Sequence, residues 1–149
     1  LRTGELLDGV PVIRRRKIPS SYGDRWMQQS QDELLNIAKN RLFTGEILRV
    51  FIYLNGILDF DNWLYTTSSQ IASDLQMHRQ NVWRSLNFLI NQDVVLVGRR
   101  SSKSSILTYR LNPYFGWKGK IVHLNQEIRR IKKAAKDAKS ETESKKTSG

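Results

Sequence analysis

Residues 67–112, TSSQIASDLQMHRQNVWRSLNFLINQDVVLVGRRSSKSSILTYRLN, decide the fold of this chain. They predict two short helices joined by a tight turn, residues 68–75 and 79–91, and then two strands, 94–97 and 106–111, around a polar loop. Apolar residues at helical spacing give the two helices a shared core, predicted as Ile71, Ala72, Leu75, Val82, Leu86 and Leu89. This order predicts a mainly α fold with a small β-hairpin wing, the winged helix-turn-helix.

The second predicted helix, residues 79–91, has two chemically different sides. With 100° per residue, Leu86 and Leu89 lie within about 40° of Val82 around the helix. The other side carries Gln80, Arg84, Asn87 and Asn91. Arginine can pair bidentately with guanine, and asparagine or glutamine with adenine. Solvated helix surfaces favour Glu and Lys, and residues 79–92 contain neither. The pattern therefore favours a helix that reads base edges over a plain exposed face.

Other side chains of this region each allow two interpretations. The hydroxyl residues 67–69 can hold a phosphate or simply cap the first short helix. The loop at 98–105 is either a cationic wing that contacts the DNA backbone or a soluble hairpin turn. Trp83 either stacks on sugar and thymine methyl groups or packs at the edge of the core. The predicted DNA contacts are Thr67, Ser68, Ser69, His78, Arg79, Gln80, Asn81, Trp83, Arg84, Asn87, Arg99, Arg100, Lys103, Lys118 and Lys120.

Charge is distributed unevenly along the 149 residues. Residues 1–93 carry 11 basic and 10 acidic side chains, whereas residues 94–149 carry 14 basic and 4 acidic ones. Positive charge concentrated in one part of a chain attracts polyanions. Nucleic acid is the commonest such partner, and an anionic membrane surface is the alternative. Near the N-terminus, Arg14, Arg15, Arg16 and Lys17 form a cationic run that either lies along phosphates or is a solvated loop.

Outside residues 67–112, the pattern predicts further elements. TGELLDG, near the start, predicts a turn or hairpin within an extended arm, residues 1–25. The winged domain is predicted at 26–112, with a helix at 28–43, a second helix capped by Thr44 and a short strand at 63–65. A turn and a basic helix follow at 113–139, with the helix itself at 122–139. The last ten residues have almost no apolar content and are expected to be disordered.

Catalytic interpretations fail on composition and spacing. The chain has no cysteine and two histidines 45 positions apart, His78 and His123, so neither a thiolate nor a His-x-His metal site is predicted. Asp59 and Asp61 resemble the start of a calcium loop, but leucine and glutamine stand where glycine and glutamate are required. No phosphate-binding loop is present. We expect no enzyme activity, cofactor, metal or small-molecule substrate.

Three motifs together resemble the winged-helix domain of plasmid replication proteins of the RepL type and their phage and plasmid relatives. They are TGEILRVFIYLNGILDFDNW (44–63), TSSQIASDLQMHRQNVWRSLNFL (67–89) and YRLNPYFGWKGK (109–120). The resemblance covers about half of the chain, and the N-terminal TGELLDG is similar to the openings of such proteins. It implies DNA binding at a plasmid origin or promoter, without nuclease or ATPase activity. Trp83 departs from the small hydroxyl residues usual at that position.

We expect a cytoplasmic protein that binds double-stranded DNA in a sequence-specific manner. The first expectation for its role is a replication initiator or copy-control protein that acts at an origin. A transcription repressor with the same domain is the first alternative. A non-specific basic protein that binds RNA or membrane through residues 118–139 is the second. We expect a homodimer on inverted repeats, through the helix at 28–43 or that at 122–139, and host replication proteins are possible partners. The longest apolar runs are too short to span a bilayer.

Overall fold

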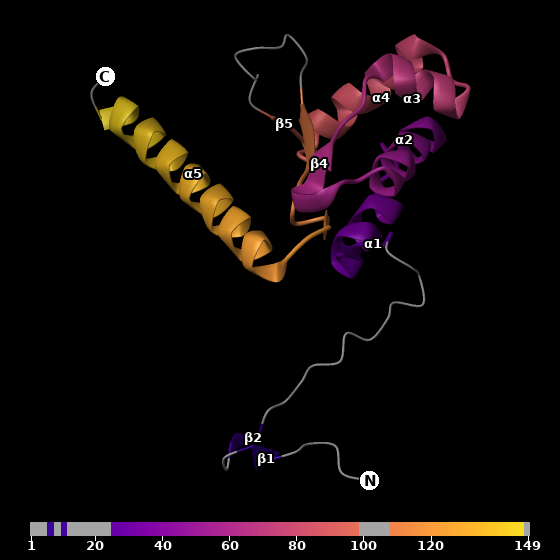
Figure 1. Ribbon diagram of the computed structural model, residues 1–149. Coiled ribbons are helices and arrows are strands. Elements are labelled where there is room, and N and C mark those ends of the chain that lie inside the picture. The colour runs from indigo at the N-terminus through magenta and orange to yellow at the C-terminus, as the bar shows by residue number, and fades with distance from the viewer. Residues whose placement is uncertain (1–5, 8–9, 12–24, 99–107, 148–149) are drawn as a thin grey trace, which may run out of the picture.

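The computed structural model describes residues 6–7, 10–11, 25–98 and 108–147 (Figure 1). These residues form a mainly helical protein with small antiparallel sheets. The helices are α1 (Gln31–Lys39), α2 (Gly45–Gly56), α3 (Ser68–Leu75), α4 (Arg79–Asn91) and α5 (Ile121–Thr147), with a 3-10 turn η1 (Phe60–Asn62). The strands are β1 (Leu6–Leu7), β2 (Val10–Pro11), β3 (Gln28–Gln29), β4 (Trp63–Leu64), β5 (Val95–Val97), β6 (Tyr109–Leu111) and β7 (Gly116–Trp117).

The core lies where α2, α3 and α4 pack together (Figure 1). Thr44 occupies the N-cap position of α2, as predicted, but its side chain makes no cap hydrogen bond. α2 buries Ile47, Val50, Phe51 and Leu54. From α3 and α4 the core receives Ile71, Val82, Leu86 and Leu89, while Ala72 and Leu75 are partly buried against it. The predicted shared core of α3 and α4 is therefore confirmed, as are the bounds of both helices.

A three-stranded antiparallel sheet closes the core in the strand order β4–β6–β5. β6 pairs with β5 through Val95↔Leu111 and with β4 through Leu64↔Tyr109. Leu64, Val95 and Leu111 are each 1% exposed, so the sheet contributes one face to the same core as the helices. The short strand predicted at 63–65 is confirmed for its first two residues. The polar loop expected between β5 and β6 lies outside the described residues from 99 to 107.

Asn62 connects η1 to the chain around β6 and β7, which lies 49 to 56 residues further along the sequence. It is 0% exposed, and its amide nitrogen donates to the carbonyls of Leu111 and Gly116 at 3.0 and 2.7 Å. Its amide oxygen accepts from the N–H of Lys118 at 2.9 Å. Asp61 and Asn62 adopt positive φ angles of 56° and 63°, which asparagine and aspartate tolerate better than most residues. This turn therefore fixes β7 and the chain entering α5 against the sheet.

The predicted helix at 28–43 is shorter in the structure. Gln28 and Gln29 instead form β3, which pairs with β7 through Gln28↔Trp117. Ser30 then caps α1, because its hydroxyl accepts from the N–H of Glu33 at 3.3 Å. α1 ends at Lys39, and the chain returns through a turn that places Phe43 edge-on against Phe88, with ring centroids 5.1 Å apart. The helix begins late because a cap and a strand pairing compete for its first residues.

α5 extends away from the rest of the structure (Figure 1). It begins at Ile121 and runs to Thr147, so the prediction of disorder beyond residue 139 is wrong up to that residue. Residues 121–147 contain neither glycine nor proline and are rich in alanine, lysine and glutamate, all of which favour a helix. Low apolar content was therefore a poor guide to disorder here. No helix within the described residues is long and apolar enough to cross a membrane.

The predicted arm lies mostly outside the described residues. Within it, β1 and β2 pair antiparallel through Leu6↔Pro11 and Leu7↔Val10, in agreement with a hairpin at TGELLDG. The cationic run Arg14, Arg15, Arg16 and Lys17 lies outside the described residues.

Candidate nucleic-acid interface

The turn between α3 and α4 determines how α4 is presented. Gln76 adopts the left-handed conformation, with φ 51° and ψ 46°, and ends α3. The N–H of Met77 returns to the carbonyl of Ala72 at 3.0 Å, which closes the turn. His78 is the N-cap of α4 but gives no side-chain cap hydrogen bond. The first turn of α4 therefore presents its N–H groups without a capping side chain.

Side chains of α2 hold α3 in place. The guanidinium of Arg49 donates to the carbonyl of Leu75 at 2.8 Å, which satisfies a terminal carbonyl of α3. The hydroxyl of Tyr53 donates to the carboxylate of Asp74. Burial, and secondly this hydrogen bond, raise the pKa of Tyr53, so the phenol stays protonated as the donor at neutral pH. These contacts fix α3, and with it the turn that leads into α4.

The first two turns of α4 have an exposed outer face. His78, Arg79, Gln80 and Arg84 are exposed, and the Trp83 side chain is 59% exposed. The alternative in which Trp83 packs at the edge of the core is therefore wrong. Val82, Ser85, Leu86 and Leu89 are buried on the other side, as the helical periodicity predicts. Asn87 differs from its predicted neighbours because it is half-buried.

A shallow hollow of about 450 Å³ lies between the starts of α3 and α4. It is lined by Ser68, His78, Arg79, Gln80 and Trp83, all of which were predicted to contact DNA. The structure therefore brings these five residues together. Thr67 and Ser69 are exposed beside Ser68 in the same first turn of α3. Arg99, Arg100 and Lys103 lie outside the described residues, although β5 and β6, which flank their loop, are both described.

Asn81 and Arg84 form a polar chain with Glu46 from the first turn of α2. The guanidinium of Arg84 donates to the amide oxygen of Asn81 at 2.7 Å, and the amide nitrogen of Asn81 donates to Glu46 at 3.1 Å. Asn81 is thus engaged through both ends of its amide, which suits a positioning role better than a direct base contact. Glu46 was not among the predicted site residues, although the i, i+3 spacing of Asn81 and Arg84 is typical of neighbours on a helix.

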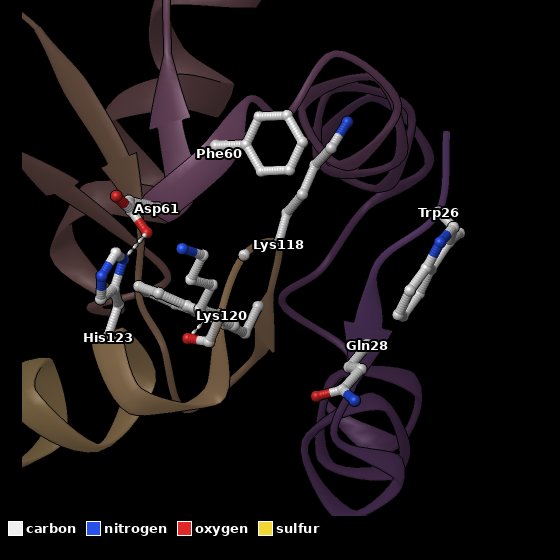
Figure 2. A pocket seen from close by; sticks show the side chains of 9 residues that line it. Trp26, Gln28, Phe60, Asp61, Lys118, Lys120 and His123 are labelled. Atoms are coloured by element: carbon white, nitrogen blue, oxygen red, sulfur yellow. Dashed lines mark hydrogen bonds and ion pairs between the residues drawn. The ribbon is translucent and has the colours of Figure 1, made fainter. Parts of the chain in front are cut away.

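Lys118 and Lys120 lie apart from the α3–α4 hollow. They line a second hollow of about 550 Å³ with Trp26, Phe60 and His123, shown in Figure 2. The Lys118 ammonium lies 5.3 Å from the centroid of the Phe60 ring. His123 Nδ1 is 3.0 Å from the carboxylate of Asp61 (Figure 2). The two lysines were predicted as site residues, but the aromatic residues around them were not, because these come from distant segments.

Thr67 gives a first testable prediction. Its hydroxyl accepts from the N–H of Gln70 at 3.2 Å, which is a helix N-cap contact. We expect Thr67→Ala to lower the free energy of unfolding by about 1 kcal/mol, as loss of such a cap usually does. Urea denaturation monitored by circular dichroism measures this loss. Ser69→Ala, on the exposed side of the same turn, is the control and should change stability by much less.

Within the described residues no group of three or more histidine, aspartate or glutamate side chains could hold a metal ion. The chain matches no protein-family model, and comparison with curated proteins and with solved structures gave no match.

Proposed function

We propose that residues 26–112 form a winged helix-turn-helix domain that binds double-stranded DNA in a sequence-specific manner. The observation that supports it best is the outer face of α4, where Arg79, Gln80 and Arg84 are exposed beside Trp83. α4 contains no aspartate, glutamate or lysine, so its outer face offers hydrogen-bonding groups without negative charge. Such side chains suit the major groove, which presents a distinct donor and acceptor pattern for each base pair.

In this proposal, α4 enters the major groove and the start of α3 contacts the DNA backbone. Arg79, Gln80 and Arg84 lie near base edges, while the exposed hydroxyls of Thr67 and Ser69 contact phosphates. The loop between β5 and β6 acts as the wing. Trp83, between these groups, packs against sugar or thymine methyl groups. Asn81 acts through Arg84 rather than on DNA itself.

The motifs that resemble RepL-type proteins favour a role in plasmid replication, as an initiator or copy-control protein at an origin. A transcription repressor could use the same domain and the same face of α4. A plasmid carrying the gene and its flanking DNA separates the two. Loss of replication on deletion of the gene supports the initiator, whereas normal replication with altered transcription supports the repressor.

Selection from a pool of random duplexes tests the DNA-binding proposal itself. We expect a defined sequence to be enriched, and we expect the protein to bind it at least a thousandfold more tightly than a scrambled duplex. Fluorescence anisotropy at physiological salt measures both affinities. Equal affinity for every duplex, with binding lost only when residues 118–139 are removed, would instead support the non-specific basic binder.

The proposed wing gives a prediction about salt dependence. Replacing Arg99, Arg100 and Lys103 together with alanine should weaken binding to all duplexes by a similar factor. We expect the slope of log K against log[salt] to become shallower by up to about three, because each lost phosphate contact removes about one unit. Affinities measured between 50 and 200 mM salt give the slope. An unchanged slope would show that the loop does not contact phosphates.

A further inference from the structure

Two hollows of this protein share two of their lining residues, Trp26 and Lys118. The larger is the hollow of about 550 Å³ shown in Figure 2, and the smaller has about 230 Å³. Because both contain the same two side chains, the hollows adjoin and together form a groove, the Trp26 groove. Arg25 lines only the smaller hollow and Lys120 only the larger one, so cations are spread along the groove.

Two aromatic rings of the Trp26 groove are exposed rather than packed into the core. The side chains of Trp26 and Phe60 are 53% and 64% exposed. In Figure 2 they lie on opposite sides of the larger hollow, and the segment with Lys118 and Lys120 lies between them. Trp117 is different, because it is 2% exposed and its indole N–H donates to the carbonyl of Lys120 at 3.1 Å. Trp26 and Phe60 thus leave apolar surface available to a ligand with a flat ring.

The charge of the Trp26 groove is positive. Among the described residues, no carboxylate lies within ion-pair distance of Lys118 or Lys120. The Lys118 ammonium instead lies 5.3 Å from the centroid of the Phe60 ring, a cation–π contact that holds it beside the hollow. Asp61 carries the one carboxylate among the described lining residues, and it lies 3.0 Å from His123 Nδ1. The two lysines are therefore available to an anion.

The turn that carries the two lysines is fixed through its backbone. The N–H of Lys118 donates to the side-chain oxygen of Asn62 at 2.9 Å, and its carbonyl accepts from the N–H of Asp61 at 2.7 Å. Gly119 follows with a φ of 143°, and a Cβ at this position would lie 3.0 Å from the carboxylate of Asp61. The lysines are thus anchored before a ligand arrives, which lowers the entropy cost of binding.

Exposed rings beside anchored cations suit the nucleotides of a single strand. Bases stack on aromatic side chains, while a positively charged groove follows the phosphates. A base within a duplex has both faces covered by its neighbours, so only an unpaired base can offer a face to Trp26. An acidic peptide would pair with the cations but requires no ring. A membrane surface would meet rings that protrude, whereas these rings line hollows.

We propose that the Trp26 groove binds an unpaired segment of nucleic acid, with a base stacked on Trp26 and the adjoining phosphates on Lys118 and Lys120. Arg25 contacts a further phosphate on the other side of Trp26. Its guanidinium donates to the carbonyl of Gly56 at 3.0 Å, which orients it along the groove. This site is separate from the outer face of α4, so it does not require that α4 binds duplex DNA.

A thymidine oligonucleotide and an abasic strand of the same length test the role of the base in the full-length protein. We expect Trp26→Ala to raise the dissociation constant for the thymidine strand by about 5- to 150-fold, the range for loss of one stacked base. Affinity for the abasic strand should stay nearly unchanged. Tyr65→Ala removes an exposed ring that lines neither hollow and is the control. Equal affinity of the wild type for the two strands, or equal weakening by both variants, would overturn the proposal.

The double variant Lys118→Ala/Lys120→Ala tests the phosphate contacts. We expect the slope of log K against log[salt] for the thymidine strand to become shallower by up to about 1.4, because each contact in a single strand contributes about 0.7. Lys132→Ala/Lys136→Ala removes the same charge from exposed positions of α5 and should keep the wild-type slope. A similar change of slope in both variants would mean that the chain attracts strands through its overall charge, without a site.

Further ligands separate the Trp26 groove from the duplex site and from a membrane surface. Trp26→Ala should bind the selected duplex like the wild type, because the proposed duplex contacts lie on α3, α4 and the wing. If no duplex is selected, the proposal for α4 fails while the single-strand titrations still decide this one. Tighter binding of a uridine strand would support the groove with RNA as its ligand. Binding of phosphatidylserine vesicles that Trp26→Ala abolishes, without binding of either strand, would overturn the proposal in favour of a membrane contact.

Discussion

Arg84→Ala is expected to lower the affinity for the selected DNA site by about 5- to 150-fold, the range for loss of one good bidentate base contact. Arg84 is exposed on the outer face of α4, and its guanidinium is held by Asn81 at 2.7 Å. A guanidinium fixed in this way is already oriented before DNA arrives, so less entropy is lost on binding. Affinity for a scrambled duplex should fall far less, because a base contact contributes to discrimination more than to general attraction.

Fluorescence anisotropy with selected and scrambled duplexes measures both effects of Arg84→Ala. Arg129→Ala removes the same charge from an exposed position of α5 and serves as the control. We expect the control to keep its preference for the selected site. If Arg84→Ala kept both the affinity and the preference, α4 would not be the recognition helix.

The substitution Glu46→Gln tests the same polar chain at a residue that is not proposed to contact DNA. Its carboxylate accepts from Asn81, which in turn holds Arg84. Glu46→Gln also removes a negative charge from the start of α2. We therefore expect tighter binding to scrambled DNA together with a smaller preference for the selected site. The same anisotropy titrations measure both. A uniform gain on both duplexes would show that Glu46 acts through its charge alone.

Local patterns were sufficient to predict the helices that face the core. α4 has an amphipathic sequence between His78 and Gln92, and its predicted bounds match the structure. The N-cap positions of Thr44 and Thr67 are recognisable because each directly precedes a run with helical periodicity, although only Thr67 makes a side-chain cap hydrogen bond. The exposed face of α4 follows from the same periodicity. What this face binds does not follow from the fold, and the DNA proposal rests on the chemistry of its side chains.

Features that depend on distant residues could not be predicted in this way. β3 and β7 have only two residues each and pair across almost ninety residues of sequence, so neither has a local signal. Asn81 and Glu46 are 35 residues apart, and only the packing of α2 against α4 brings them together. The end of α5 was missed for another reason. Its composition resembles a disordered segment, but nothing in it interrupts a helix.

Asn62→Ala is expected to have the largest effect on stability, a loss of about 3 kcal/mol in the free energy of unfolding. The buried amide of Asn62 donates to the carbonyls of Leu111 and Gly116 and accepts from the N–H of Lys118. Alanine would leave these groups without this partner and out of reach of water. It would also have to adopt a φ of 63°, which is unfavourable for a residue with a Cβ and no polar side chain.

Urea denaturation monitored by tryptophan fluorescence measures the effect of Asn62→Ala. Asn62→Asp keeps an acceptor for Lys118 but loses the amide donor, and it brings an uncompensated charge into a site that is 0% exposed. It should therefore be destabilising as well. Asn125→Ala, at an exposed position of α5, is the control and should unfold like the wild type. A loss below about 1 kcal/mol for Asn62→Ala would mean that the turn relaxes to satisfy these groups in another way. In that case Asn62 would not be what holds β7 and the start of α5 against the sheet.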